Sequence, residues 1–235
     1  MFGYHDIPLK IVQEGISLSV QKDRGGLVYK RDCLDEHVEK RLLATNGKIL
    51  VNPVEPLNKP KALTQYLLVE FEKTLAIEPE GTEKIFLTFP IEIAVYISRD
   101  KDFEVIDILT LTRQKFTLYG GPGNGIICKY WKSDVFSTMP SVNPIQEGLM
   151  ELTVANTNAQ WVELTKAVFN AYGMKLHYSN TMVSMKASMN LKTRNRAETD
   201  FLDSPLKKGM KKSLEVYAAR KMSLTAPKFI MEFGL

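Results

Sequence analysis

The segment KIFLTFPIEIAVYIS, residues Lys84–Ser98, decides the fold class of this chain. Every second position in it is apolar: Ile85, Leu87, Phe89, Ile91, Ile93, Val95 and Ile97. Alternation with a period of two residues is typical of a β-strand that buries one face. Pro90 has no N–H group to donate to a neighbouring strand, so we expect an edge position, a bulge or a break there.

Similar runs lie on both sides of this segment and are separated by frequent turn signals. Asn46-Gly47 is the strongest short hairpin signal in the chain. The predicted strands are Arg41–Thr45, Lys48–Val54, Gln65–Phe71 and Phe103–Leu111. Short strands with many turns predict an antiparallel β-sandwich, immunoglobulin-like or jelly-roll-like, over residues 1–145.

The pattern changes near residue 145, where we place a domain boundary. Residues 146–235 are expected to form a smaller β-rich domain with one helix near residues 158–171. Three signals favour that helix: a capping box at Thr157 and Gln160, an apolar stripe of Trp161, Leu164 and Val168, and the stop signal Gly173. The predicted strands of this domain are Leu149–Ala155, Met174–Tyr178, Met182–Leu191, Ser213–Ala219 and Lys228–Phe233.

Composition indicates a soluble cytoplasmic protein. Hydrophobic residues make up 44% of the chain and charged residues 25%, which is ordinary for a globular protein. No apolar run approaches the roughly 20 residues that span a bilayer. The first residues lack the features of a signal peptide. Cys33 and Cys128 are far apart in sequence, and we interpret them as two reduced thiols.

The net charge of +4 hides a basic segment, residues 186–228, with eleven Lys or Arg against four Asp or Glu. Its cations gather at Lys192, Arg194 and Arg196, and again at Lys207, Lys208, Lys211 and Lys212. Such a segment can attract phosphates or an acidic protein face. A solvated loop is the favoured interpretation, because no aromatic residue lies within either basic group to stack on bases. Met210 lies between the lysines, where a flexible side chain suits an adaptable docking surface.

The stretch FTLYGGPGNGIICKYW, residues Phe116–Trp131, is the best candidate for a ligand site. Its candidate ligand-binding residues are Tyr119, Gly120, Gly121, Gly123, Asn124, Lys129, Tyr130 and Trp131. Backbone N–H groups around the glycines can form an anion nest, with Lys129 beside a bound phosphate. A hairpin tip is the favoured alternative, because the sequence continues as a strand and supplies no helix dipole.

Sequence motifs for catalysis and metal binding are absent. The chain has no P-loop, no dinucleotide fingerprint, no Cys-x-x-Cys pair and no Gly-x-Ser-x-Gly elbow. We therefore predict no catalytic residue, no metal site and no cofactor, and favour a non-enzymatic role. Glu92 and Asp107 lie among isoleucines, where a carboxylate can be tuned for acid–base chemistry; the favoured interpretation is that each pairs with an arginine or tyrosine or points outward from one sheet face.

Five segments together resemble an archaeal family classed as domain of unknown function number 432. They are VNPVEPLNKPKALTQYLLVE, FLTFPIEIAVYI, FTLYGGPGNGIICKYW, NAYGMKLHY and FIMEFGL. The resemblance spans nearly the whole chain. It implies no activity, cofactor or catalytic residue.

These observations favour a cytosolic binding or adaptor protein that acts as a subunit or regulator of a larger protein assembly. One alternative is a small-ligand or phosphate-binding protein, or an enzyme, that uses the loop Tyr119–Trp131. Another is an RNA- or ribosome-associated protein that uses the basic segment. A protein partner is expected, and a membrane-protein partner stays open although this chain shows no transmembrane segment.

Overall fold

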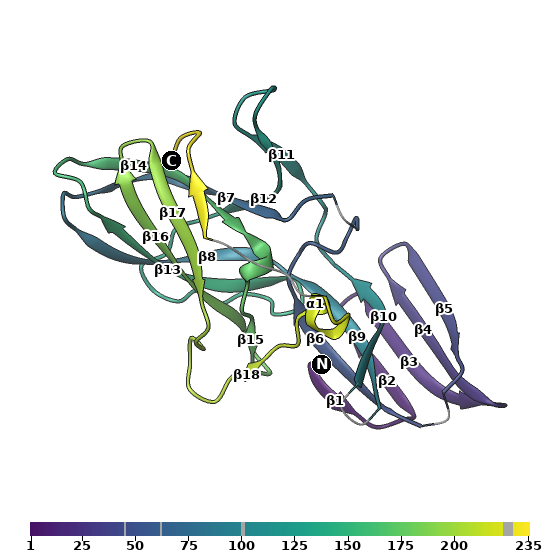
Figure 1. Ribbon diagram of the computed structural model, residues 1–235. Coiled ribbons are helices and arrows are strands. Elements are labelled where there is room, and N and C mark those ends of the chain that lie inside the picture. The colour runs from purple at the N-terminus through teal and green to yellow at the C-terminus, as the bar shows by residue number, and fades with distance from the viewer. Residues whose placement is uncertain (45, 62, 100–101, 223–227) are drawn as a thin grey trace.

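The computed structural model describes residues 1–44, 46–61, 63–99, 102–222 and 228–235. Within these residues the fold is mainly β, with nineteen strands in four sheets (Figure 1). The helical elements described are a single 3-10 turn, Ala171–Gly173, and the one-turn helix α1 (Val216–Ala219). The β-rich fold class is therefore confirmed. Residue 45 of the first predicted hairpin arm and residues 223–227 of the basic segment lie outside the described residues.

An antiparallel meander forms the N-terminal sheet and lies at one end of the elongated molecule (Figure 1). Its strands, in spatial order, are β2 (Leu9–Gln13), β3 (Ile16–Asp23), β4 (Gly26–Cys33) and β5 (Glu36–Leu42). Ile16, Leu18 and Val20 alternate with polar residues along β3 and are buried. One face of the meander therefore packs onto the rest of the protein.

The second sheet is also antiparallel and lies next to the meander. Its order is β1 (Gly3–His5), β6 (Lys48–Val54), β9 (Glu92–Arg99) and β10 (Asp102–Leu109). The hairpin predicted at Asn46-Gly47 is wrong, because β5 pairs with β4 whereas β6 pairs with β1 and β9. The partners of β6 are distant in sequence, and a local turn signal does not contain that information.

The third and fourth sheets form the other half of the molecule. The third has the order β11 (Phe116–Tyr119), β12 (Ile126–Ser133), β7 (Tyr66–Ile77) and β14 (Val162–Asn170). The fourth contains β18 (Lys211–Lys212), β15 (His177–Tyr178), β16 (Val183–Thr193), β13 (Glu147–Asn156) and β8 (Thr82–Pro90), with β17 (Arg196–Leu202) and β19 (Phe229–Met231) beyond β16. Two pairs, β7 with β12 and β13 with β16, are parallel, so the sheets are not purely antiparallel.

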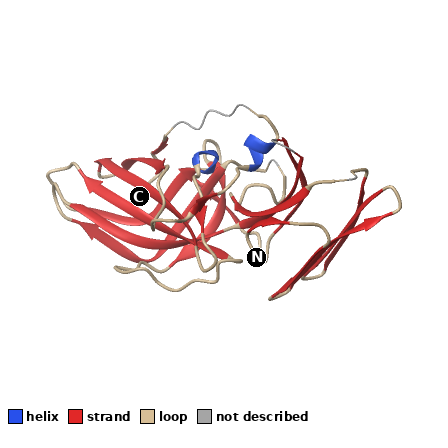
Figure 2. Cartoon of the chain, turned by 90° about the horizontal axis from the view of Figure 1, so that it is seen from below, coloured by secondary structure: helices blue, strands red, loops and turns tan. Residues whose placement is uncertain are grey.

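These two sheets face each other (Figure 2). Phe169 of β14 stacks on Phe201 of β17 with ring centroids 5.1 Å apart, and Thr199 of β17 donates to the Val168 carbonyl. Both sheets contain strands from each side of residue 145, so the predicted domain boundary does not coincide with a boundary between sheets.

The break predicted at Pro90 is confirmed. β8 ends at Pro90 in the fourth sheet, and β9 begins at Glu92 in the second. Ile91 between them is buried. The alternating segment that decides the fold class therefore connects the two halves of the molecule.

The helix predicted near residues 158–171 is wrong, because β14 occupies most of this range. The register of β14 against β7 shifts between Leu164 and Lys166. A bulge inserts an extra residue, which interrupts the period of two. Leu164 and Val168 are both buried, and a spacing of four residues puts two side chains on one face of a strand as well as of a helix, whereas Trp161 of the predicted stripe is 58% exposed. The predicted strand Ser213–Ala219 is also wrong, because its second half forms α1.

Candidate functional site

The glycine-rich stretch forms the tip of the β11–β12 hairpin, as the favoured interpretation predicts. The N–H group of Gly125 donates to the Gly121 carbonyl at 2.7 Å, and that of Asn124 donates to the same oxygen at 3.3 Å. Gly120 has φ +106°, and a Cβ there would lie 2.8 Å from the Phe233 ring. Two N–H groups of the hypothetical anion nest are thus already used within the turn.

Lys129 is buried and its ammonium group faces another part of the protein. Its side chain is 2% exposed, with Nζ 3.3 Å from Glu92 Oε1 and 3.2 Å from the Lys59 carbonyl. The same carboxylate accepts the N–H groups of Asn58 at 2.9 Å and Lys59 at 3.1 Å. Burial lowers the pKa of Lys129 and raises that of Glu92, and each charge opposes the other's shift. Lys129 is a structural ion-pair partner in this arrangement.

The predicted aromatic ligands also make structural contacts. The Tyr119 hydroxyl donates to the Gly234 carbonyl at 3.0 Å and accepts the Phe233 N–H at 3.1 Å. Trp131 Nε1 donates to Thr88 Oγ1 at 2.9 Å, and Tyr130 is half-buried. Gly121, Gly123 and Asn124 stay at the tip. Two open clefts, of about 510 and 570 Å³, flank the hairpin.

An exposed apolar surface covers one side of this hairpin. We call it the hairpin patch and define it by Leu63, Phe116, Leu118 and Ile127, whose exposed fractions are 45%, 36%, 44% and 48%. Leu118 lies directly opposite Ile127 in the hairpin, so their side chains share a face. Leu63 and Ile127 line the same cleft.

Strand β11 is the edge of its sheet and presents free backbone groups. The Lys115 carbonyl accepts the Tyr130 N–H, which fixes the alternation of the antiparallel ladder. Phe116 and Leu118 then occupy the pairs without hydrogen bonds, and their N–H and C=O groups point away from β12. An edge of this kind is a template for pairing with another extended segment.

A second buried ion pair joins the N-terminal meander to β10. Arg31 is 1% exposed, and its Nε lies 2.9 Å from Asp107 Oδ2. Tyr29 donates to the same oxygen at 2.8 Å, and burial together with the Asp107 charge raises the pKa of Tyr29. The prediction that Asp107 pairs with an arginine or tyrosine is confirmed, and both do so.

The two ion pairs are linked through the segment that follows β6. Arg31 Nη1 lies 3.0 Å from Glu36 Oε2, and Lys59 Nζ lies 3.2 Å from the same atom. Lys59 also supplies the backbone groups that contact Glu92 and Lys129. We call Arg31, Glu36, Lys59, Glu92, Asp107 and Lys129 the junction charges. They connect the meander, the second sheet and β12.

The structure does not bring the predicted partner-binding cations together. Arg194 and Arg196 lie at the start of β17, whereas Lys207, Lys208, Met210, Lys211 and Lys212 follow its other end. The strand's 7 residues separate the groups by roughly 20 Å. Arg196 pairs with Glu232 at 2.5 Å and Lys212 with Asp203 at 2.5 Å. Met210 is half-buried and its sulfur accepts a hydrogen bond from Ser184.

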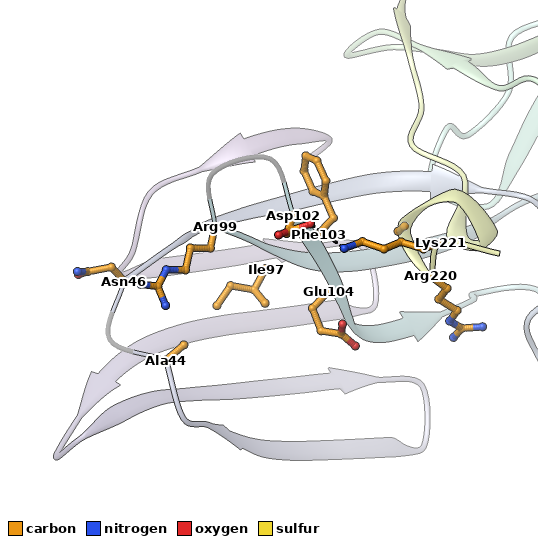
Figure 3. Close-up of a pocket in the computed structure, with 10 residues that line it drawn as sticks. Ala44, Asn46, Ile97, Arg99, Asp102, Phe103, Glu104, Arg220 and Lys221 are labelled. Carbon is orange, nitrogen blue, oxygen red and sulfur yellow. Dashed lines mark ion pairs between the residues drawn. The ribbon is translucent and has the colours of Figure 1, made fainter. Parts of the chain in front are cut away.

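A cleft of about 340 Å³ lies where β9 and β10 meet α1 (Figure 3). Ile97 and Phe103 give it apolar walls. Lys221 reaches across its rim and pairs with Asp102 at 3.0 Å, with both side chains 79% exposed. Arg220 extends away from this pair (Figure 3). Solvated charges at such a rim hold a ligand weakly.

Three features are absent from the described residues. No group of three or more His, Cys, Asp or Glu side chains is placed to hold a metal ion. No described helix has the length and apolar character needed to cross a membrane. Cys33 and Cys128 are both buried and free, so the prediction that they are unpaired thiols is confirmed.

Sequence reasoning missed Arg31, Glu36, Lys59 and Glu55. Glu55 stands in the apolar run VNPVEPL, and an isolated carboxylate in such a run was the available signal. Arg31 lies two residues from Tyr29 and two from Cys33 on β4, so it shares their inward face. Neither signal identifies a partner.

The comparisons agree with the resemblance seen in the sequence. A family model described as "Protein of unknown function (DUF432)" matches residues 1–232. No curated protein and no solved structure matches the chain. The chain has 235 residues and the family model covers nearly all of them, so the chain belongs to the DUF432 family.

Proposed function

We propose that this chain is a cytosolic, non-enzymatic binding protein that pairs with an extended segment of a protein partner along strand β11. The observation that carries the proposal is the coincidence of a free strand edge with the hairpin patch. The backbone groups of Phe116 and Leu118 supply main-chain hydrogen bonds, and the apolar side chains supply pockets for alternate residues of the partner.

Charge indicates the chemistry of the partner segment. The chain has no acidic residue between Ile108 and Ser133, whereas Arg113 and Lys115, just before β11, are exposed. Acidic residues beside alternating apolar ones would complement this edge. The occupant is therefore an acidic, apolar strand of a different protein, which agrees with a role as a subunit or regulator of a larger assembly.

The hairpin is rigid enough to act as a preformed docking element. Gly120 and Gly125 fit positions where a Cβ would lie within 3.0 Å of other atoms, and Tyr119 is held by two hydrogen bonds to the C-terminal residues. A preorganised edge loses less entropy on binding.

The test is a binding measurement by fluorescence polarisation with two synthetic peptides that share an alternating valine pattern and carry either glutamate or lysine between the valines. The glutamate peptide should bind the full chain and the lysine peptide should not. Leu118→Ser should weaken binding by about tenfold or more. Leu202→Ser is the matched control, because Leu202 is 43% exposed on another strand.

Equal affinity of the two leucine variants would overturn the proposal, as would preference for the lysine peptide. Sedimentation of the wild-type chain provides a further check. A dimer that Leu118→Ser dissociates would show that a second copy occupies the edge, which also contradicts a different protein as the occupant.

A further inference from the structure

A small cavity of about 120 Å³ lies beneath α1, beside the segment that follows β6. Glu55, Asn58 and Lys61 contribute to its wall from that segment. Tyr172 contributes from the 3-10 turn, and Tyr217 and Arg220 from α1 and its C-terminal end. A water molecule takes up about 30 Å³ in the liquid, so the space suits a ligand of only a few heavy atoms.

Glu55 is the buried acidic group of this cavity. Its side chain is 4% exposed, and no ion pair joins it to a cation among the described residues. The two nearby carboxylates are each neutralised, Glu92 by Lys129 at 3.3 Å and Glu215 by Lys175 at 2.6 Å. Burial raises the pKa of Glu55 to about 8, and the Glu92 and Glu215 charges add to this effect. Hydrogen bonds from its own backbone N–H group and from the Asn58 side chain offset only part of this effect on the pKa, so Glu55 keeps its proton at neutral pH.

The outer part of the cavity carries the opposite charge. Lys61 and Arg220 are both exposed. Tyr172 and Tyr217 also line the cavity, with ring centroids 6.3 Å apart and planes at 75°. Arg220 lines both this cavity and the neighbouring cleft, and in Figure 3 its side chain points away from the Lys221–Asp102 pair.

We propose that this cavity binds a small zwitterion such as an α-amino acid, with its ammonium group on Glu55 and its carboxylate toward Lys61 and Arg220. The proposal goes beyond the protein-binding role and does not depend on it. Glu55 is protonated at neutral pH, so a bound ammonium group would displace that proton to solvent and pair with the carboxylate that remains. A simple anion has no cation at the Glu55 end of the cavity, and a simple cation would meet the charges of Lys61 and Arg220 at the entrance. A zwitterion satisfies both ends. Lys175 Nζ already lies 5.8 Å from the centroid of the Tyr217 ring, so Tyr172 is the ring left to contact a ligand's ammonium group.

The test is isothermal titration calorimetry of the full chain with glycine and L-alanine, and with ethylamine and acetate as ligands that carry one charge each. At least one of the two amino acids should bind with saturation, and more tightly than either control. Glu55→Gln should weaken that binding by about tenfold or more, the effect of losing a charged hydrogen-bond partner.

Arg220→Gln keeps the test decisive if the Glu55 variant does not fold, because Arg220 is exposed and its replacement leaves the core intact. It should also weaken binding. Glu104→Gln, an exposed carboxylate at the separate cleft, is the control and should bind as the wild type does. No heat of binding for either amino acid would overturn the proposal, and so would unchanged affinity in Arg220→Gln.

Discussion

The junction charges and the basic C-terminal segment are two highly charged regions of the chain, and they differ in solvent exposure. In the junction, Arg31, Glu92 and Lys129 are each no more than 2% exposed. In the basic segment, the ion pairs of Arg196 and Lys212 are about half exposed. Solvent screens exposed pairs to roughly 0–1 kcal/mol, whereas breaking a buried pair leaves an uncompensated charge. Burial therefore decides which charges control stability.

Lys129→Met gives the largest expected effect. It leaves the Glu92 carboxylate, which is fully buried, without its cation. The free energy of unfolding should fall by about 3–5 kcal/mol, as measured by chemical denaturation. Lys132→Met on the same strand is the control, because Lys132 pairs with Glu72 at 2.9 Å but is 46% exposed. It should lower the free energy of unfolding much less, because solvent screens this exposed pair.

The double variant Glu92→Gln with Lys129→Met sharpens this comparison. Removing both charges should recover part of the loss, because no unpaired ion then remains in the core. Equal losses for Lys129→Met and Lys132→Met would contradict the assignment of Glu92 and Lys129 as a buried pair.

Asp107→Asn should have the next largest effect. It removes the carboxylate that holds Arg31 and Tyr29, and the free energy of unfolding should fall by about 2–3 kcal/mol. The loss should be smaller than for Lys129→Met, because Glu36 still pairs with Arg31 at 3.0 Å. Asp23→Asn is a suitable control, since its pair with Arg41 is half exposed. A larger loss of unfolding free energy for Asp23→Asn than for Asp107→Asn would contradict the conclusion that buried ion pairs control stability.

Glu92 and Asp107 show how far the sequence could predict this site. Their apolar neighbours indicate burial, and buried carboxylates need partners, so pairing was predictable. The partners were not, because Lys129 is 37 residues from Glu92 and Arg31 is 76 residues from Asp107. The packing of different sheets against one another brings them together, and period-two alternation contains no information on which sheets meet.

The same limit explains which predictions about the fold were right and which were wrong. Alternation identified most strands because it depends only on neighbours in sequence, and the missing N–H group of Pro90 indicated the break between β8 and β9. It failed at β14, where the shift between Leu164 and Lys166 disturbs the period. It failed again at Asn46-Gly47, where the flanking strands join different sheets.

The pH dependence of stability tests Glu55. Its pKa is about 8 in the folded protein, against an ordinary value of 4.5. Between these values the folded protein keeps a proton that the unfolded chain has lost. The free energy of unfolding should therefore decrease as pH rises from 4.5 to 8, by at most about 1.4 kcal/mol per pH unit. Above pH 8 this contribution is fully lost.

Denaturation of Glu55→Gln across the same pH range isolates this group, because the other titrating residues are shared with the wild type. The variant should lose most of the downward slope and should be more stable than the wild type at pH 8. Glu104→Gln, which changes an exposed carboxylate, should keep the wild-type slope. A wild-type slope in Glu55→Gln would show that Glu55 ionises normally.

The smallest effect on stability is expected in the basic segment, with Lys207→Gln combined with Lys208→Gln. Both side chains are exposed, so the free energy of unfolding should change by less than about 0.5 kcal/mol.

The same variant tests RNA binding, since each phosphate contact that is lost lowers the slope of log affinity against log salt concentration by about one unit. Single-stranded RNA and the glutamate peptide are the two probes. If the basic segment is only a solvated surface, the wild type should show weak RNA affinity, and the variant should bind the peptide as the wild type does. If the wild type instead binds RNA tightly with a steep salt dependence, and the variant reduces both, the basic segment recognises nucleic acid. The exposed charges of the basic segment would then contribute to binding, whereas the buried junction charges contribute to stability.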